Sequence, residues 1–304
     1  MRTILFVKTS SLGDVVHNCP AVSDAARALP GAALDWMVEE PFAGVAAMHR
    51  AVRRVIPVAL RRWRSTLFKG STWSEISAWR RRLAAERYDA VVDTQSLVKS
   101  ALLAKLAAGT RHGMDRASAR EALATLFYDV RHAVPRSLHA VERNRMLAGK
   151  ALGFSPAGPL DYGLRVPGAQ KSGYFVLLTM TSRADKLWPE ERWIELGHAL
   201  GAPAVLPWGS EPERQRAQRI SEAIGGTVPP RRSLDDLAKL FAGARGVVGL
   251  DTGLTHLAVA LGVPTVGVYC GSEPRLTGLH GTSGRNLGGP GSAPSVDEVL
   301  NALA

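Results

Sequence analysis

Short apolar runs rich in β-branched residues alternate with longer helical patterns along the whole chain, and this alternation limits the fold more than any other feature. It is typical of a parallel sheet covered by helices on both faces, because each parallel connection needs a crossover helix. We therefore predict an α/β fold. The predicted strands are residues 3–7, 34–38, 54–58, 89–93, 174–179, 204–207, 246–250 and 265–269. Helices are expected from about Asp14, Phe42, Trp73, Gln95, Pro189, Glu211, Ser233 and Thr252.

A region rich in chain breakers, residues 154–159 followed by Pro167 and Gly168, separates the two halves of this pattern. With 304 residues the chain is long enough for two domains, which we place at residues 1–160 and 161–304. Two such open sheets bind ligands at the carboxyl ends of their strands, so a cleft between them is expected. Residues 278–291 are predicted to be a glycine-rich loop before a last helix at 296–303, which could pack back on the first domain.

The overall composition excludes several classes of protein. Hydrophobic residues make up 46% of the chain, which is typical of a folded globular protein and not of a disordered one. Cys19 and Cys270 are far apart and form no metal-binding spacing, so neither a disulfide framework nor a zinc site is expected. The N-terminus lacks the apolar core of a signal peptide, and a cytoplasmic protein is expected.

The chain is strongly basic, with 38 Lys and Arg against 27 Asp and Glu, a net charge of +11. An anionic partner, solubility or an arginine-rich genome would each explain this excess, and composition leaves the three open. Aromatic residues are only 6%, and no helix-turn-helix or RNA-binding signature is found, so we expect no nucleic-acid partner.

The first predicted strand ends in Lys8-Thr9-Ser10-Ser11-Leu12-Gly13-Asp14 and leads into a helix. Free backbone N–H groups at such a turn favour anions. Asp14 could simply cap the helix, or it could act as a general base facing the cleft. The turn matches neither a dinucleotide fingerprint nor a phosphate-binding P-loop, so dehydrogenase and ATPase activities lose support.

Two turns in the second half have a composition suited to phosphate. Thr181, Ser182 and Lys186 follow one strand, and Asp251, Thr252, Gly253 and His256 follow another. Hydroxyls, a lysine and helix N-termini can together hold a nucleotide diphosphate without a metal. Glu213 lies at a third strand end, where it could accept hydrogen bonds from ribose. Each turn taken alone is also compatible with ordinary capping, a solvated loop or a structural histidine.

Basic residues are concentrated between positions 50 and 82, where Glu75 is the only acid. Much of this segment could be a solvated face. Arg61, Arg62 and Arg64 directly follow a strand end, where arginine side chains suit phosphate and carboxylate ligands.

Four spaced segments, residues 8–14, 55–64, 206–209 and 251–256, together resemble the ADP-heptose:lipopolysaccharide heptosyltransferase I family, which belongs to glycosyltransferase family 9. The resemblance runs in order from residue 1 to about residue 271. It implies a GT-B fold, in which two Rossmann-like parallel-sheet domains face each other across a cleft. The first domain would bind the acceptor and the second the nucleotide sugar. Arg232 departs from the family, which has a methionine near the adenine at this position.

The resemblance also implies an activity: inverting, metal-independent transfer of L-glycero-D-manno-heptose from ADP-heptose to Kdo of Kdo-lipid A, without a cofactor. Asp14 would be the catalytic base. The implied donor-binding residues are Thr181, Ser182, Lys186, Glu213, Asp251, Thr252, Gly253 and His256. The implied acceptor-binding residues are Lys8, Ser10, Gly13, Arg61, Arg62, Arg64 and Arg120.

A lipid acceptor would further place the protein, as a peripheral protein, on the anionic cytoplasmic face of the inner membrane. Two alternatives stay open: a related glycosyltransferase with another nucleotide sugar or acceptor, and a binder of nucleotides or anionic glycolipids without turnover.

Overall fold

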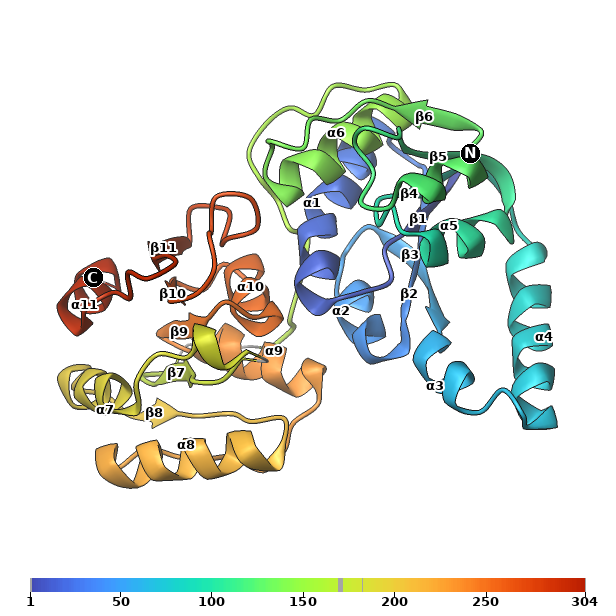
Figure 1. The fold of residues 1–304 in the computed structure, drawn as a ribbon. Coiled ribbons are helices and arrows are strands. Elements are labelled where there is room, and N and C mark those ends of the chain that lie inside the picture. Colours follow the sequence, from blue (N-terminus) through green and yellow to red (C-terminus); the bar gives the residue numbers. More distant parts are fainter. Residues whose placement is uncertain (1, 169–171, 182, 304) are drawn as a thin grey trace. The chain divides into compact units, whose positions relative to one another are not determined.

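The computed structural model describes residues 2–168, 172–181 and 183–303, and it divides into two compact units. Unit 1 spans Met1–Gly163 and unit 2 spans Leu164–Ala304. Each unit is a parallel sheet with helices packed on it (Figure 1), which confirms the predicted α/β class.

Unit 1 contains a six-stranded sheet in the order β3-β2-β1-β4-β5-β6, in which every pair of neighbours is parallel. The strands are β1 (Thr3–Val7), β2 (Ala33–Glu39), β3 (Val52–Val58), β4 (Arg87–Asp93), β5 (Ala108–Met114) and β6 (Val130–His132). The helical elements are α1 (Leu12–Ala28), η1 (Glu40–Phe42), α2 (Ala43–Ala47), α3 (Leu60–Ser65), α4 (Gly70–Ala84), α5 (Val98–Lys105), η2 (Ala122–Phe127) and α6 (Ala140–Leu152). The central strand β1 is almost wholly apolar and buried, as expected of a strand covered on both faces.

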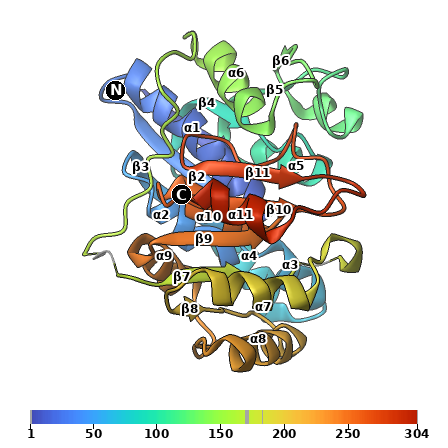
Figure 2. The same ribbon diagram turned by 90° about the vertical axis from the view of Figure 1, so that its left-hand side faces the viewer.

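Unit 2 contains a five-stranded parallel sheet in the order β11-β10-β9-β7-β8. Its strands are β7 (Phe175–Leu178), β8 (Ala204–Val205), β9 (Gly246–Leu250), β10 (Thr265–Tyr269) and β11 (Gly284–Gly288). Its helical elements are η3 (Ala184–Lys186), α7 (Glu190–Ala199), α8 (Glu211–Ile224), α9 (Leu234–Gly243), α10 (Gly253–Ala260) and α11 (Val296–Leu303). Figure 2 shows α7 and α11 lying side by side in front of this sheet, in agreement with their direct packing.

The two sheets share one strand order. Thr227 forms a single parallel bridge with Val205 of β8, in the place of a third strand. When this bridge is counted, unit 2 follows the order 3-2-1-4-5-6 of unit 1. In this arrangement the chain reverses its direction of winding between the first and fourth strands, which is where doubly wound sheets bind ligands.

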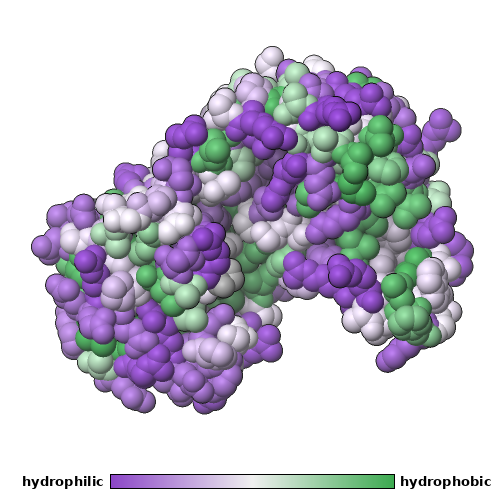
Figure 3. All heavy atoms as spheres, in the orientation of Figure 1, coloured by the Kyte–Doolittle hydropathy of each residue, from purple (hydrophilic) through white to green (hydrophobic). Residues whose placement is uncertain are grey.

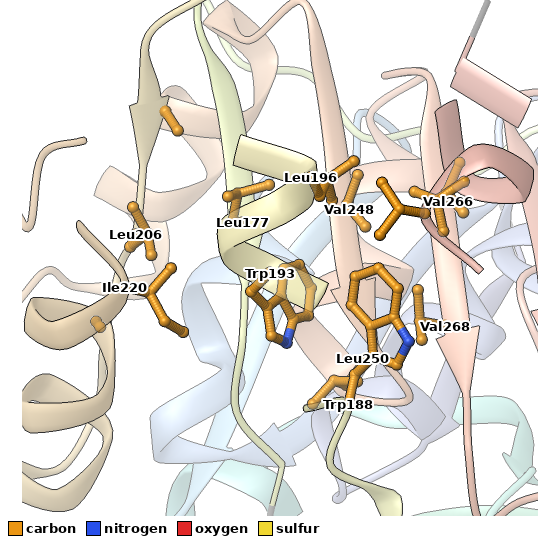
Figure 4. Close-up of a cluster of buried hydrophobic side chains, with 14 residues drawn as sticks. Leu177, Trp188, Trp193, Leu196, Leu206, Ile220, Val248, Leu250, Val266 and Val268 are labelled. Atoms are coloured by element: carbon orange, nitrogen blue, oxygen red, sulfur yellow. The ribbon is translucent and has the colours of Figure 1, made fainter. Parts of the chain in front are cut away.

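The core of unit 2 packs one face of the sheet against α7, α8 and α11. Trp188 and Trp193 are fully buried with their rings edge to face, 5.0 Å between centroids, over Leu177, Val248 and Leu250 (Figure 4). Val296 and Val299 of α11 belong to the same core, so this helix is part of unit 2.

The strands predicted at 3–7, 246–250 and 265–269 and the last helix at 296–303 have the observed bounds. Strand 204–207 is shorter than predicted, and α5 begins at Val98 instead of near Gln95. The prediction of a loop throughout 278–291 was wrong, because β11 forms there by pairing with β10. The strands β5, β6 and β11, the helices α3 and α6 and the short helical turns η2 and η3 were not predicted from the sequence.

Among the described residues, no helix is both long and apolar enough to span a bilayer.

Candidate active site

In unit 1 the direction of winding reverses between β1 and β4, and polar segments follow both strands there. Gln95, after β4, joins the two segments. Its side-chain oxygen accepts the backbone N–H groups of Thr9, at 3.0 Å, and Ser10, at 3.2 Å, and its amide nitrogen donates to the Ser10 carbonyl. The turn that presents Ser10 is therefore held by three hydrogen bonds from one side chain.

Gln95 is itself positioned by a buried carboxylate, Asp93, at the end of β4. One Asp93 oxygen accepts the N–H of Gln95 at 2.9 Å, and the other accepts the hydroxyls of Tyr128, at 2.7 Å, and Ser100, at 2.8 Å. Burial raises the pKa of Asp93, and these hydrogen bonds to the ionised form oppose the rise. Asp93 thus fixes the position of the segment that carries Gln95.

Asp14 lies in the first turn of α1, at the same edge of the sheet. Its Oδ2 accepts the N–H of Ser11 at 3.2 Å and lies 3.1 Å from Nη1 of Arg120. The side chain is 24% exposed. The carboxylate therefore caps the helix and remains accessible, so both roles considered for Asp14 from the sequence are compatible with the structure.

Further cations lie near Asp14. Lys8 is buried, and its Nζ donates to the Thr94 carbonyl at 2.9 Å. Burial lowers the pKa of Lys8, and the negative charge of Asp14 opposes that change. Lys99 donates to Oγ of Ser10 at 3.2 Å. Gly13 is the second residue of α1. The structure thus brings together four predicted acceptor-binding residues with Asp14: Lys8, Ser10, Gly13 and Arg120.

The three other predicted acceptor residues, Arg61, Arg62 and Arg64, lie on α3, which follows the edge strand β3. Arg62 pairs with Glu40 at 2.8 Å and Glu75 at 2.6 Å, so its charge is largely compensated. The Arg61 guanidinium lies 5.9 Å from the centre of the Phe42 ring, and Arg64 is exposed. Within the described part of the chain, no hydrogen bond or ion pair links these arginines to Asp14.

In unit 2 the equivalent reversal of winding lies between β7 and β9. An ion pair joins the segments that follow these two strands. Nζ of Lys186, in η3 after β7, lies 2.6 Å from Oδ2 of Asp251, which follows β9. Ser272 donates to the same oxygen at 2.8 Å, and Nε2 of His256 lies 3.9 Å from Oδ1. Lys186, Asp251 and His256, which come from two predicted turns, thus form one cluster.

Asp251 is held in its ionised form by this cluster. Burial by itself would raise the pKa of Asp251, but the hydrogen bonds from His256, Lys186 and Ser272 outweigh it and hold the pKa well below its ordinary value. The carboxylate therefore keeps its charge at neutral pH and fixes the Lys186 ammonium at this edge of the sheet.

Helix α10 begins at the same place, with Thr252 as its N-cap and Gly253 as its first residue. The Thr252 hydroxyl lies 3.2 Å from that of Thr255, which donates to the Leu250 carbonyl at 2.6 Å. A side chain at Gly249 would lie 2.5 Å from the Thr255 hydroxyl, so a glycine is required for this close approach. The first N–H groups of a helix attract anions, and the Lys186 ammonium, paired with Asp251, lies at the same edge of the sheet.

The remaining predicted donor-binding residues are Thr181, Ser182 and Glu213. Thr181 is half-buried three residues beyond β7, and Ser182 lies outside the described residues. Glu213 accepts the N–H of Gly209 at 2.7 Å, so one of its oxygens fixes the turn between β8 and α8.

Gln95, Lys99 and Ser272 belong to these clusters but were not predicted from the sequence. Each follows or lies near a strand end, but its neighbours become apparent only once the strand order is known. The part of the chain that the structure describes holds no group of three or more His, Cys, Asp or Glu side chains able to bind one metal ion.

Comparison with protein families matches residues 76–299 to the model of glycosyltransferase family 9 (heptosyltransferase). Lipopolysaccharide heptosyltransferase 1 of Escherichia coli K12 is 47% identical over 290 residues, which cover 91% of this chain and 91% of that protein. The protein of the same name from Pseudomonas aeruginosa is 46% identical over 298 residues, 94% of this chain and 83% of its own length.

Two solved structures of the heptosyltransferase WaaC of Escherichia coli are also similar. The complex with ADP has a TM-score of 0.93 at 44% identity and covers 99% of this chain and 100% of its own. The complex with ADP-2-deoxy-2-fluoro heptose has a TM-score of 0.89 at 44% identity, and it covers 98% of both chains.

Proposed function

Because the chain belongs to glycosyltransferase family 9, we propose that it transfers L-glycero-D-manno-heptose from ADP-heptose to Kdo of the lipopolysaccharide inner core. The observation that carries this proposal is the 47% identity to lipopolysaccharide heptosyltransferase 1 across 91% of both chains. The WaaC structures contain ADP or an ADP-heptose analogue, which supports a nucleotide-sugar donor.

Asp14 is the proposed general base. Its partly exposed carboxylate takes the proton of the Kdo hydroxyl while that oxygen attacks the anomeric carbon of heptose. The bond from this carbon to the diphosphate oxygen breaks, and ADP leaves with the electron pair. One displacement from the opposite face inverts the anomeric configuration and requires a single base. Nη1 of Arg120 lies 3.1 Å from this carboxylate, so it helps to orient the Asp14 side chain.

The cluster around Asp251 is the proposed donor site. Lys186 and the α10 N-terminus, with Thr252 and Gly253, stabilise the charge that develops on the departing diphosphate. Thr181, Ser182 and His256 complete the set of hydrogen-bond donors. Asp251 and Glu213 accept hydrogen bonds from hydroxyl groups of the donor's sugars. We propose that no metal is required, since Lys186 and the helix N-terminus supply the positive charge.

Lys8, Ser10, Gly13 and Arg120 are the proposed contacts to the acceptor nearest Asp14, and Arg61, Arg62 and Arg64 bind its outlying anionic groups. An acceptor built on lipid A resides in a membrane, so the protein works as a peripheral protein on the cytoplasmic face of the inner membrane. Its net charge of +11 suits an anionic surface.

Release of ADP from ADP-heptose tests this function, measured with and without Kdo-lipid A and in the presence of EDTA. The proposal requires release that depends on the acceptor and survives EDTA. Tight ADP binding without acceptor-dependent release would instead favour a related glycosyltransferase with another sugar or acceptor. Loss of release in EDTA would refute the metal-independent mechanism alone.

A further inference from the structure

The exposed apolar side chains of this protein are unevenly distributed. In the described part of the chain, every large apolar side chain that is exposed lies in unit 1, between residues 67 and 130. Scattered single exposures are normal on a folded protein, but a concentration in one segment is typical of an interaction surface. Apart from Val130 of β6, these side chains form two groups, one at the turn between α3 and α4 and one on α5 and η2.

The first group, the apolar tip, consists of Leu67, Phe68 and Trp73. Phe68 is fully exposed, and Trp73 is 56% exposed. Two hydrogen bonds nevertheless brace the backbone of this turn. Nε1 of Trp73 donates to the Leu67 carbonyl at 2.8 Å, and the Thr72 hydroxyl donates to the Thr66 carbonyl at 2.8 Å. The tip therefore presents an aromatic ring to solvent on a fixed support.

The second group, the α5–η2 patch, consists of Leu102, Leu106, Leu123 and Leu126. Leu123 and Leu126 are 66% and 70% exposed, and α5 packs directly on η2. Figure 3 shows hydrophobic surface over α5 and at the end of the α3–α4 hairpin on the same face of unit 1. Leu123 of this patch lies three residues after Arg120, which pairs with Asp14.

Helix α4 connects the tip to the patch. Trp73, Ser77, Arg80, Arg81 and Ala84 follow one another at helical spacing, so they lie on one face of α4. The last four of these line a shallow depression together with Leu106 of α5. A continuous surface therefore runs from the apolar tip along α4 to the α5–η2 patch.

The charge of this surface is positive. No described acidic side chain forms an ion pair with Arg64, Lys69, Arg80 or Arg81, in contrast to the neighbouring Arg62, which contacts two glutamates. Aromatic residues among uncompensated cations are the composition that enters the interface of an anionic bilayer. A second copy of this basic chain would bring like charges together, so charge complementarity favours the bilayer as the occupant.

We propose that the apolar tip, the Arg80–Arg81 face of α4 and the α5–η2 patch form the surface by which unit 1 docks on an anionic lipid bilayer, with Phe68 inserted among the headgroups. This inference rests on the proposed function, because a membrane-embedded acceptor is the reason for docking. It adds the orientation: the patch beside Arg120 faces the lipid, so the Asp14 site opens next to the membrane surface.

Binding of the full chain to vesicles tests the surface. Vesicles of phosphatidylglycerol and phosphatidylethanolamine are compared with vesicles of phosphatidylcholine alone. Phe68→Ser is expected to weaken binding to the anionic vesicles about tenfold, and Leu126→Ser severalfold. Arg81→Ser should weaken it roughly fivefold, and only when the lipid is anionic. Arg231→Ser, which removes one exposed arginine from unit 2, is the matched control and should bind like the natural protein.

Equal binding by Phe68→Ser, Arg81→Ser and Arg231→Ser would overturn the proposal. A dimer in sedimentation that Phe68→Ser dissociates, with no vesicle binding, would show that a second copy is the occupant and would also overturn it. Transfer to a water-soluble Kdo glycoside separates this inference from the proposed function. Phe68→Ser should keep that activity. If the natural protein lacks that activity, the proposed function is refuted, and the vesicle-binding measurements still test the docking surface independently.

Discussion

The guanidinium of Arg120 lies 3.1 Å from the carboxylate of Asp14, although 106 residues separate them in sequence. The contact joins the first helix of unit 1 to the segment before η2, and both residues remain partly exposed. A partly exposed carboxylate beside a cation is suited to receive an anionic substrate and to accept a proton from it.

Replacement of Asp14 by Asn should lower turnover about a thousandfold, because the proposed base is lost while the shape of the side chain is kept. ADP affinity should stay unchanged, since the proposed nucleotide site belongs to unit 2. The measurements are acceptor-dependent ADP release and calorimetric titration with ADP. Turnover close to that of the natural protein would leave Asp14 with its helix-capping role alone.

Arg120→Ala should raise the acceptor KM about tenfold through loss of one charge-assisted contact. Arg116→Ala is the matched control, because Arg116 is also exposed, lies four residues away and changes the net charge equally. Steady-state kinetics over a range of acceptor concentrations measure the difference. The same KM change in both variants would indicate a general charge effect and would contradict a specific role for Arg120.

Lys186→Ala should weaken ADP binding by one to two orders of magnitude. The variant removes a charge from the proposed diphosphate site and leaves Asp251, only 17% exposed, without its closest partner. The rise in melting temperature on addition of ADP should shrink accordingly. Lys239→Ala, on α9 of the same unit, serves as the control and should respond to ADP as the natural protein does.

Acid should destabilise unit 1 through His49. Burial, opposed by a hydrogen bond to the Cys19 carbonyl, lowers the pKa of His49 to about 4. Nδ1 accepts the N–H of Ala51, while Nε2 lies near the Cys19 carbonyl and Ser23, so the fold requires the neutral ring. The unfolded chain, with its histidine pKa near 6.5, therefore takes up the proton first, and stability falls as pH decreases from about 6.5 towards 4.

The expected loss from His49 is about 2 kcal/mol between pH 7.5 and pH 5. Denaturant unfolding at a series of pH values measures it. His49→Gln should be less stable at neutral pH and should show a flatter pH dependence. Parallel pH curves for the two proteins would exclude His49 as the source.

Trp193→Ala should cost about 3–5 kcal/mol of unfolding free energy, because the indole is fully buried against Trp188 and the strands of unit 2. Trp73→Ala removes an exposed indole from the apolar tip and should cost much less. Chemical denaturation of both variants provides the comparison. A small effect at Trp193 would mean that the core of unit 2 can collapse around the lost ring.

The bounds of a strand can be predicted from the sequence when nearly all of its residues are apolar and buried. β1, β9 and β10 are short apolar runs buried on both faces, and their predicted bounds agree with the structure. β5, with the sequence Ala-Gly-Thr-Arg-His-Gly-Met, is mostly half-exposed, and β11 contains two glycines on an edge. Both exist because a neighbouring strand pairs with them, and no local pattern records that pairing.

The same limit applies to the site. Asp14, Lys186 and Asp251 could be predicted as site residues because polar residues at strand ends stand out from apolar surroundings. The contact of Lys186 with Asp251 joins residues 65 apart, and the contact of Gln95 with Ser10 joins residues 85 apart. Such contacts follow from the order of strands in each sheet, which local periodicity does not encode.

The division of the chain at Gly163 has a consequence for its thermodynamics. Since each unit closes its own sheet around its own core, unfolding need not be a single cooperative event. A calorimetric trace should then resolve into two melting transitions, and ADP should move only the one that belongs to Leu164–Ala304. The protein would then have two melting temperatures, one raised by the nucleotide-sugar donor and the other by the acceptor.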